Sequence, residues 1–416
     1  MKRYDEYKDS GVEWIGEVPR HWEVVRTRYL CNLCTGNKDT INRVDDGKFP
    51  FYVRSPKVER INTYSFDGEA ILMAGDGVGA GKVFHYANGK FDYHQRVYNF
   101  HNFKKVIGKF FYYYITNNFR YIIEEGGAKN TVDSVRLYMI QNFLITVPPK
   151  EEQREIVFYL DKKCSEIDNV ISAQQKRIAL LQELKQSVIT HAVTKGLNPN
   201  VEMKDSGVEW IGKIPVSWDV VHLKRILRER MQYGANEPAE SDDTTYPRYI
   251  RITDITANGE LRPETFKSLE PSKAKDYLLD KGDVLFARSG ATVGKTFLFN
   301  ADIKACYAGY LIKASCDKRR MLPEYLYYYT QSGAYECWKN SVFIQSTIQN
   351  IGADKYQMMY IPVPSKDEQK QIVEYTMRKS QIFDAAISKA QHQVELLQEY
   401  KQSLITEVVT GKRKVS

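Results

Sequence analysis

The sequence predicts an α+β fold: two tandem, pseudo-symmetric α/β-containing domains, separated by two long helices that form an antiparallel coiled coil. Three observations predict it. The nine residues KDSGVEWIG at 8–16 return unchanged at 204–212. The strand and turn signals after each copy follow the same order, and each copy ends in a long heptad pattern. Common repeat arrays have periods of about 20–50 residues. This period is far longer, so the repeated unit is a whole domain with its connector.

Alignment of the two copies divides the chain into four segments. We expect a first domain at 1–150, a first helix at 151–197, a second domain at 198–366 and a second helix at 367–412. A chain of 416 residues is long enough for a separate hydrophobic core in each domain.

The composition places the chain among globular proteins without a membrane span. No run of about 18 apolar residues occurs, and the opening MKRYDEYKDS has no apolar signal stretch, so we expect a cytoplasmic location. The formal net charge of +8 suits a polyanionic partner. Many soluble proteins are equally basic, so charge alone does not identify that partner.

Each domain opens with the same short segment. Both copies continue from the nonapeptide into P-x-x-W-x-V-V, where Gly and Pro indicate turns and the two valines indicate a strand. We expect this segment to act as a clasp that packs its tryptophans onto the body of the domain. The tryptophans are Trp14 and Trp22 in the first copy, and Trp210 and Trp218 in the second.

The body of each domain then follows one plan with different residues. FPFYVR at 49–54 matches YPRYIR at 246–251 in outline. The stretch at 67–84 matches that at 281–297, each predicting a buried strand, a glycine-rich loop and a second strand. Between these anchors the copies share little. We therefore expect one scaffold that carries two different surfaces.

The two long helices carry a sustained 4-3-4-3 apolar spacing, which is typical of a coiled-coil seam. Equal helices that each leave an equal domain can bury their seams on one another in antiparallel fashion. The seam is predicted to contain Leu160, Ile167, Ile171, Ile178, Leu181, Val188, Phe383, Ile387, Val394, Leu397 and Leu404. Five further apolar positions widen the stripe: Leu180, Leu184, Val193, Leu396 and Val409. They pack either on a further partner or on the protein's own domains, and the pattern favours neither.

No catalytic or metal-binding motif stands out. The Gly-Lys at 294–295 follows a loop one residue too short for a phosphate-binding P-loop. No Asn-Pro-Pro-Tyr methyltransferase signature occurs, and the histidines lack metal-ligand spacing. The single pair Cys31-x-x-Cys34 has no second pair to complete a zinc site. We expect a chain without catalytic residues, metal or cofactor of its own.

The doubled SGVEWIG-x-x-P-x-x-W opening, the segment GDVLFARSGATVGK and the helix segment LLQE-x-KQS-x-IT together resemble the specificity subunits of type I restriction–modification systems. The resemblance covers essentially the whole chain. It implies a DNA-binding, non-catalytic subunit with two target recognition domains, one per half of a split double-stranded DNA site, spaced by the helices. It also implies two methyltransferase (modification) subunits as partners, and restriction (translocase and nuclease) subunits in the full complex. S-adenosylmethionine, ATP and magnesium would then belong to those partners.

We expect DNA contact where the two copies diverge. Arginine suits guanine and glutamine suits adenine, whereas lysine and serine more often contact the phosphate backbone. The candidates are Arg54, Lys82, Gln95, Arg96 and Lys129 in the first domain, and Arg251, Arg288, Ser289, Lys295, Gln345 and Ser346 in the second. For each of them an ordinary surface role stands beside the functional one.

Two other interpretations remain open. A stand-alone, two-headed DNA-binding regulator would not need so wide an apolar helix stripe, and no helix-turn-helix is evident. A coiled-coil scaffold without DNA binding is compatible with the modest charge, and salt-dependent DNA binding would exclude it.

In the specificity-subunit interpretation the helix pair sets the distance between the two half-sites. About two added residues would then correspond to one base pair, from a rise of about 1.5 Å per residue and about 3.4 Å per base pair.

Overall fold

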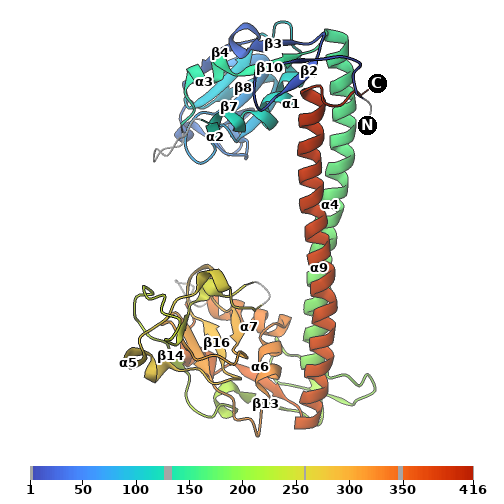
Figure 1. Ribbon diagram of the computed structural model, residues 1–416. Helices are drawn as coiled ribbons and strands as arrows, with labels where there is room; N and C mark the ends of the chain where they lie inside the picture. Colours follow the sequence, from blue (N-terminus) through green and yellow to red (C-terminus); the bar gives the residue numbers. More distant parts are fainter. Residues whose placement is uncertain (1–2, 126–133, 257–258, 345–349, 416) are drawn as a thin grey trace. The chain divides into compact units, whose positions relative to one another are not determined.

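The computed structural model describes residues 3–125, 134–256, 259–344 and 350–415 (Figure 1). Two units follow from it. Unit 1 comprises Met1–Gln174 and His392–Ser416, and unit 2 comprises Gln175–Gln391. Each unit therefore holds one globular body together with the beginning of one long helix and the end of the other.

The body of unit 1 is built on a six-stranded sheet in the order β4-β9-β7-β8-β5-β6. These strands are β4 (Asn32–Thr35), β5 (Phe49–Tyr52), β6 (Glu59–Ile61), β7 (Phe66–Ala74), β8 (Phe84–Tyr93) and β9 (Val97–His101). The long hairpin β7–β8 joins a buried apolar run, AILMA, to its partner strand, as the sequence predicts. Gly68 and Gly89 face each other across this hairpin, both with positive φ, a conformation that favours glycine.

Short elements complete unit 1. The helices are α1 (Gly108–Asn118), α2 (Arg120–Glu125) and α3 (Leu137–Asn142). The additional strands are β1 (Tyr7–Asp9), β2 (Glu17–Pro19), β3 (Glu23–Arg26) and β10 (Leu144–Val147), which pair β1 with β2 and β3 with β10. The aromatic run FFYYYIT of α1 buries Phe110, Phe111 and Tyr114 in one core with Phe100 of the sheet.

Unit 2 repeats this plan with shorter strands. A four-stranded sheet has the order β14-β19-β16-β17, and three strand pairs, β11-β12, β13-β20 and β15-β18, flank it. The strands are β11 (Met203–Asp205), β12 (Lys213–Pro215), β13 (Asp219–His222), β14 (Gln232–Tyr233), β15 (Arg248–Ile250), β16 (Val284–Ala287), β17 (Thr296–Leu298), β18 (Ala305–Tyr307), β19 (Leu311–Ala314) and β20 (Tyr360–Val363). The helices are α5 (Pro271–Ala274), α6 (Pro323–Tyr329), α7 (Gly333–Ile344) and α8 (Ala353–Gln357).

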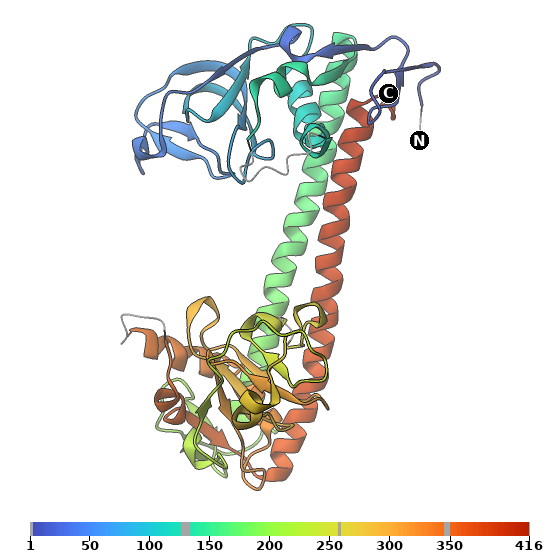
Figure 2. The same ribbon diagram turned by 60° about the vertical axis from the view of Figure 1, so that its left-hand side comes forward.

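The long helices are α4 (Lys150–Lys195) and α9 (Lys366–Val409), which lie side by side in both views (Figures 1 and 2). Their antiparallel register is fixed by one interhelical ion pair in each unit. Lys401 Nζ lies 2.7 Å from Asp168 Oδ1 in unit 1, and Lys185 Nζ lies 2.7 Å from Asp384 Oδ1 in unit 2. When the LLQE segments are aligned, Asp168 and Lys185 of α4 occupy the positions of Asp384 and Lys401 of α9. The two ion pairs are therefore repeats of one contact, which confirms the predicted antiparallel pair.

The predicted seam residues lie at the interior of the helix pair. Leu160, Ile167, Ile171, Ile387 and Leu404 are buried, and the others of the set are half-buried. The wider apolar stripe divides. Val193 and Val409 are fully buried in the cores of their own units, whereas Leu180, Leu184 and Leu396 are 56%, 45% and 50% exposed. Packing on the protein's own domains therefore holds for Val193 and Val409, and a further partner at Leu180, Leu184 and Leu396 stays a prediction.

The opening segments act as the predicted clasps, and each one meets the ends of both long helices. In unit 1 the buried Trp22 ring donates through Nε1 to Glu152 Oε2 at the start of α4, at 3.1 Å. Tyr7 Oη donates to the carbonyl of Gly411 just beyond α9. In unit 2 Trp218 donates to Glu368 at the start of α9, at 2.9 Å, and its ring lies beside Gly196 just beyond α4.

Each clasp therefore satisfies polar groups at helix ends while burying one large ring.

Within the described ranges, no helix combines the length and the apolar character needed to cross a bilayer.

Candidate nucleic-acid interface

Three loops converge at the same place on both scaffolds, as backbone hydrogen bonds show. The first follows β5 in unit 1 and β15 in unit 2: Tyr52 accepts from the N–H of His94, and Ile250 accepts from the N–H of Ala308. The second follows β7 or β16, and the third is the turn before β9 or β19. Gly81 donates to Ala74, and Gly294 donates to Ala287, both at 2.9 Å, which closes the second loop in each unit.

These registers define equivalent positions in the two units. Asp76 is the second residue beyond Ala74, as Ser289 is beyond Ala287. Arg96 and Tyr310 each directly precede the strand that pairs there. In the second loop, one scaffold position carries a carboxylate in unit 1 and a hydroxyl in unit 2. In the third loop, another position carries a guanidinium in unit 1 and a phenol in unit 2.

In unit 1 the three loops gather two arginines around one carboxylate. Arg54 Nη1 lies 2.9 Å from Asp76 Oδ1, and Arg96 Nε lies 3.6 Å from Asp76 Oδ2. The Asp76 side chain is 20% exposed, whereas those of Arg54 and Arg96 are 45% and 65% exposed. The carboxylate is thus largely covered, and the two guanidinium groups remain open to solvent. We call these three residues the Asp76 cluster.

The turn before β9 is held by a neutral histidine. His94 Nδ1 accepts the N–H of Arg96 at 2.9 Å, so its proton sits on Nε2, which faces Asp39 Oδ2 at 3.6 Å. Burial, followed by the nearby Arg54 charge, lowers the pKa of His94, which favours this neutral form. Gln95 donates through Nε2 to the same Asp39 oxygen at 2.9 Å. The turn therefore presents Gln95 and Arg96 side by side at the surface.

Lys82 is exposed on the glycine-rich loop that carries Asp76. The tip of this loop, Val78, is 91% exposed, and Ile41 beside Asp39 is 88% exposed. Lys129 lies outside the described residues. The structure thus brings Arg54, Lys82, Gln95 and Arg96 onto one group of loops, and leaves Lys129 a prediction.

In unit 2 the second and third loops carry Arg288 and Tyr310, and the neighbouring strand β14 adds the ring of Tyr233, in place of the Asp76 cluster. The guanidinium carbon of Arg288 lies 5.0 Å from the centroid of the Tyr233 ring, within cation–π range. Its Nε is buried without a hydrogen-bond partner among the described residues. Tyr310, whose carbonyl accepts the N–H of Arg288, is 67% exposed. This arrangement offers flat aromatic faces beside a single guanidinium.

Ser289 pairs with Asn350 through an isolated β-bridge, as Asp76 pairs with Ser134 in unit 1. Gln345 and Ser346 lie in the stretch before Asn350, outside the described residues. Their proposed contact with DNA stays a prediction.

A basic hollow of about 480 Å³ opens beside the second loop of unit 2. Lys295 and Arg262 contribute its positive charge, and Lys339 forms an ion pair with Glu336. The hydroxyl-bearing residues Thr256, Thr292, Thr296, Tyr327 and Thr330 add polar lining. Lys295 is exposed. The hollow suits a negatively charged group such as a phosphate, which lysine and arginine bind by charge.

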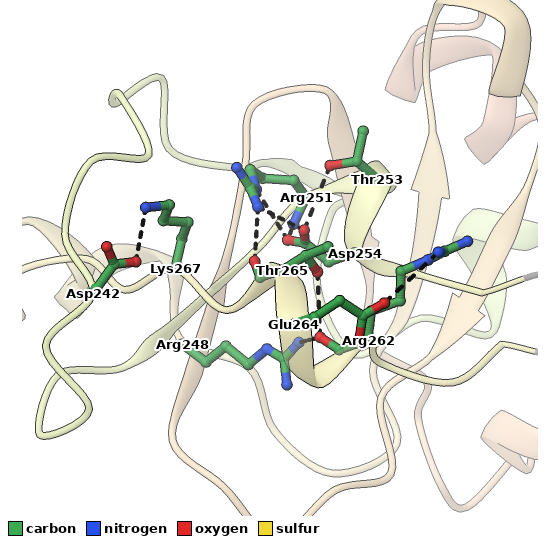
Figure 3. Close-up of polar contacts among 9 residues, drawn as sticks. All are labelled: Asp242, Arg248, Arg251, Thr253, Asp254, Arg262, Glu264, Thr265 and Lys267. Carbon is green, nitrogen blue, oxygen red and sulfur yellow. Dashed lines mark hydrogen bonds and ion pairs between the residues drawn. The ribbon is translucent and has the colours of Figure 1, made fainter. Parts of the chain in front are cut away.

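Arg251 differs from the other candidates, because its side chain points to Asp254 and Thr265 of its own unit (Figure 3). Its Nη2 donates to Asp254 Oδ1 at 2.7 Å and to the carbonyl of Thr265 at 2.8 Å, and its Nε donates to Asp254 Oδ2 at 3.1 Å. The Asp254 side chain is 1% exposed. The hydrogen bond to Asp254, opposed by partial burial, raises the pKa of Arg251. The Nε and Nη2 donors of Arg251 are therefore engaged by the protein's own loops.

The sequence analysis missed several residues that shape these sites: Asp76, Asp39 and His94 in unit 1, and Tyr233 and Tyr310 in unit 2. Asp76 lies inside the glycine-rich loop that the repeat alignment singles out, so its divergence from Ser289 was a visible signal. The pairing of Tyr233 with Arg288 had no sequence signal, because the two residues are far apart in the chain.

The described residues contain no cluster of three or more His, Cys, Asp or Glu side chains arranged to hold a metal ion. The six cysteines are all free thiols.

Both globular bodies match one known protein family. The family described as the type I restriction modification DNA specificity domain matches residues 19–180 and again residues 215–395. The chain belongs to this family. It is a specificity subunit with two DNA-recognition domains, as the resemblance implied.

Two named relatives agree with this assignment. The chain is 23% identical to the type I restriction enzyme MjaVIII specificity subunit of Methanocaldococcus jannaschii, over 96% of this chain and 94% of that protein. It is 28% identical to the EcoDI specificity subunit of Escherichia coli, over 43% of this chain and 39% of that protein. A solved structure from work on the assembly and conformational transition of a type I restriction–modification system superimposes with a TM-score of 0.68 at 16% identity. That match covers 94% of this chain and 98% of the other, and shows the shared fold.

Proposed function

We propose that this specificity subunit recognises a bipartite, asymmetric DNA target, with one globular body for each half-site. One observation carries the proposal: equivalent loops on equivalent scaffolds bear different chemistry. Unit 1 presents two arginines on a carboxylate, and unit 2 presents one arginine on a tyrosine. A subunit that read the same sequence twice would need the same side chains twice.

The proposed DNA contacts follow from what each side chain is free to do. In unit 1, Arg54 and Arg96 are proposed to meet base edges, since arginine pairs bidentately with guanine. Gln95 suits adenine, and Lys82 and Lys129 suit phosphates.

In unit 2, Arg288 is proposed for base contact, with Ser289, Gln345 and Ser346 beside it. Lys295 and the basic hollow suit the backbone. Arg251 is proposed to hold the loop that carries its neighbours through Nε and Nη2, which leaves only Nη1 for a contact with DNA.

We further propose that the helix pair docks two methyltransferase subunits, and restriction subunits in the full complex. Leu180 and Leu184 of α4 have the same heptad places as Leu396 and Tyr400 of α9, and all four are about half exposed. Two equivalent apolar patches suit two copies of one partner. Catalysis and its cofactors, S-adenosylmethionine, ATP and magnesium, then reside on those partners, and this chain supplies recognition without chemistry.

The test is co-expression with a type I methyltransferase subunit, followed by native mass measurement and DNA binding at several salt concentrations. We expect two methyltransferase copies per chain and binding that weakens as salt rises. The double variant Leu396→Glu/Tyr400→Glu should reduce the stoichiometry to one copy, because a charged side chain opposes burial of the patch. Gln402→Glu, an added charge at a half-buried position further along α9, is the control and should keep both copies.

A chain that binds DNA specifically without any methyltransferase would favour the regulator interpretation. No salt-dependent DNA binding at all, in the assembled complex, would overturn the proposal.

A further inference from the structure

Asp76 presents a physical problem if unit 1 binds DNA. A carboxylate among DNA-facing loops repels every phosphate, because both are negatively charged. Its ion pairs with half-exposed arginines contribute little to stability, because solvent screens exposed ion pairs. Stability therefore does not explain why a carboxylate stands at the centre of the cluster.

The backbone holds Asp76 firmly in place. Gly75, immediately before it, donates to the carbonyl of Arg96 at 2.8 Å and accepts from Val135 at 2.8 Å. Asp76 itself forms a β-bridge with Ser134. The carboxylate is thus fixed between β9 and the segment that begins at Ser134, on a loop whose remainder is rich in glycine. A fixed carboxylate can serve as a template for mobile side chains.

The two arginines use different oxygens of that template. Arg54 approaches Oδ1 through a terminal nitrogen, and Arg96 approaches Oδ2 through Nε. The closest approach of Arg96 to the carboxylate is through Nε, so its two terminal nitrogens, its planar fork, form no ion pair or hydrogen bond among the described residues. A free arginine loses side-chain conformational freedom when it is immobilised, so a pre-oriented fork binds a base edge at lower cost.

We propose that Asp76 is a specificity-determining positioning residue. It holds Arg54 and Arg96 in a shared orientation for base edges, and it cancels enough of their charge to keep them off the phosphate backbone. This inference rests on the proposed function, namely that unit 1 reads one half-site. Non-specific affinity comes almost entirely from phosphate contacts, so a residue that discourages them raises the ratio of specific to non-specific binding. Unit 2 has Ser289 at the equivalent position and lacks this device.

The test is Asp76→Asn in the full chain, assembled with its methyltransferase subunits. Dissociation constants are measured over a salt series for the mapped target, for each half-site substituted in turn, and for an unrelated duplex. We expect the unrelated duplex to bind several-fold more tightly, with a salt dependence steeper by about one phosphate contact. Discrimination at the half-site that Arg54→Ala relaxes should fall about tenfold, and discrimination at the other should stay unchanged.

Two variants separate this role from simpler ones. Asp39→Asn removes the same charge from a neighbouring carboxylate that holds Gln95 and no arginine, and it should not steepen the salt dependence. Asp76→Glu keeps the charge and should recover part of the discrimination.

The inference is overturned if Asp76→Asn weakens binding equally to all duplexes, or leaves first-half discrimination intact. It is also overturned if Asp39→Asn reproduces the whole effect. If the unaltered complex fails to discriminate its target from the unrelated duplex, the proposed function itself fails.

Discussion

Arg54 and Arg251 look equivalent in sequence and lie in different surroundings. The outline match of FPFYVR with YPRYIR aligns them, but the strand registers align Tyr52 with Ile250, one residue earlier. Arg251 therefore follows its strand directly, and Arg54 comes one residue later. Arg251 turns to the buried Asp254, whereas Arg54 reaches the partly exposed Asp76.

This difference predicts opposite consequences for two matched substitutions. Arg251→Ala leaves the Asp254 carboxylate buried with only backbone and weak hydroxyl donors, and should lower the free energy of unfolding by about 2–3 kcal/mol. Arg54→Ala removes an exposed pair and should cost under about 1 kcal/mol. Urea unfolding of the two variants measures both. Equal losses of stability would show that the Arg251 pair has no structural role.

The candidate site could be predicted in part for the same reason. Divergence between the repeats pointed to the loops that carry Arg54, Arg96 and Arg288, and the structure brings the unit 1 residues together. Divergence between the repeats could not show which arginines already form ion pairs within the protein. Asp254 and Asp76 form these pairs because of their burial and their strand register. Neither property follows from sequence spacing.

At the scale of elements, the long helices were the most predictable part of the fold. Their heptads are local patterns, so the sequence predicts both the helices and the seam. Which residues of the wider apolar stripe are buried depends on long-range packing against the globular bodies, which the heptad pattern does not predict. Val193 and Val409 meet the body of their own unit, and Leu180, Leu184 and Leu396 do not.

The repeated lysine–aspartate contact predicts a specific coupling between the helices. Lys185→Asp places two negative charges together at the seam and should lower the free energy of unfolding by about 1 kcal/mol, and Asp384→Lys in the same chain should restore most of it. The equivalent pair, Lys401 with Asp168, serves as an internal control and should give a similar coupling energy. Urea denaturation of each single and double variant completes the cycle. The register would be contradicted if the double variant lost as much free energy of unfolding as the two single variants lose together.

At the scale of the whole molecule, the chain contains two copies of one scaffold. The clasps, the sheets and the helix register repeat, and the residues in the three converging loops do not. The repeat predicted two domains. It did not predict the convergence of the loops, which depends on long-range pairings such as β5 with β8 and β15 with β18. Conservation between the copies therefore marks the scaffold, and divergence marks recognition.

The central claim is that each body reads its own half of a split target, and methylation mapping tests it most directly. The complex with its methyltransferase subunits is mapped at single-molecule resolution for the unaltered chain, for Arg54→Ala and for Arg288→Ala. The account predicts a bipartite target in the first case, relaxed positions in one half-site only for Arg54→Ala, and relaxed positions in the other half-site only for Arg288→Ala. A continuous target, or relaxation of the same half-site by both variants, would contradict it.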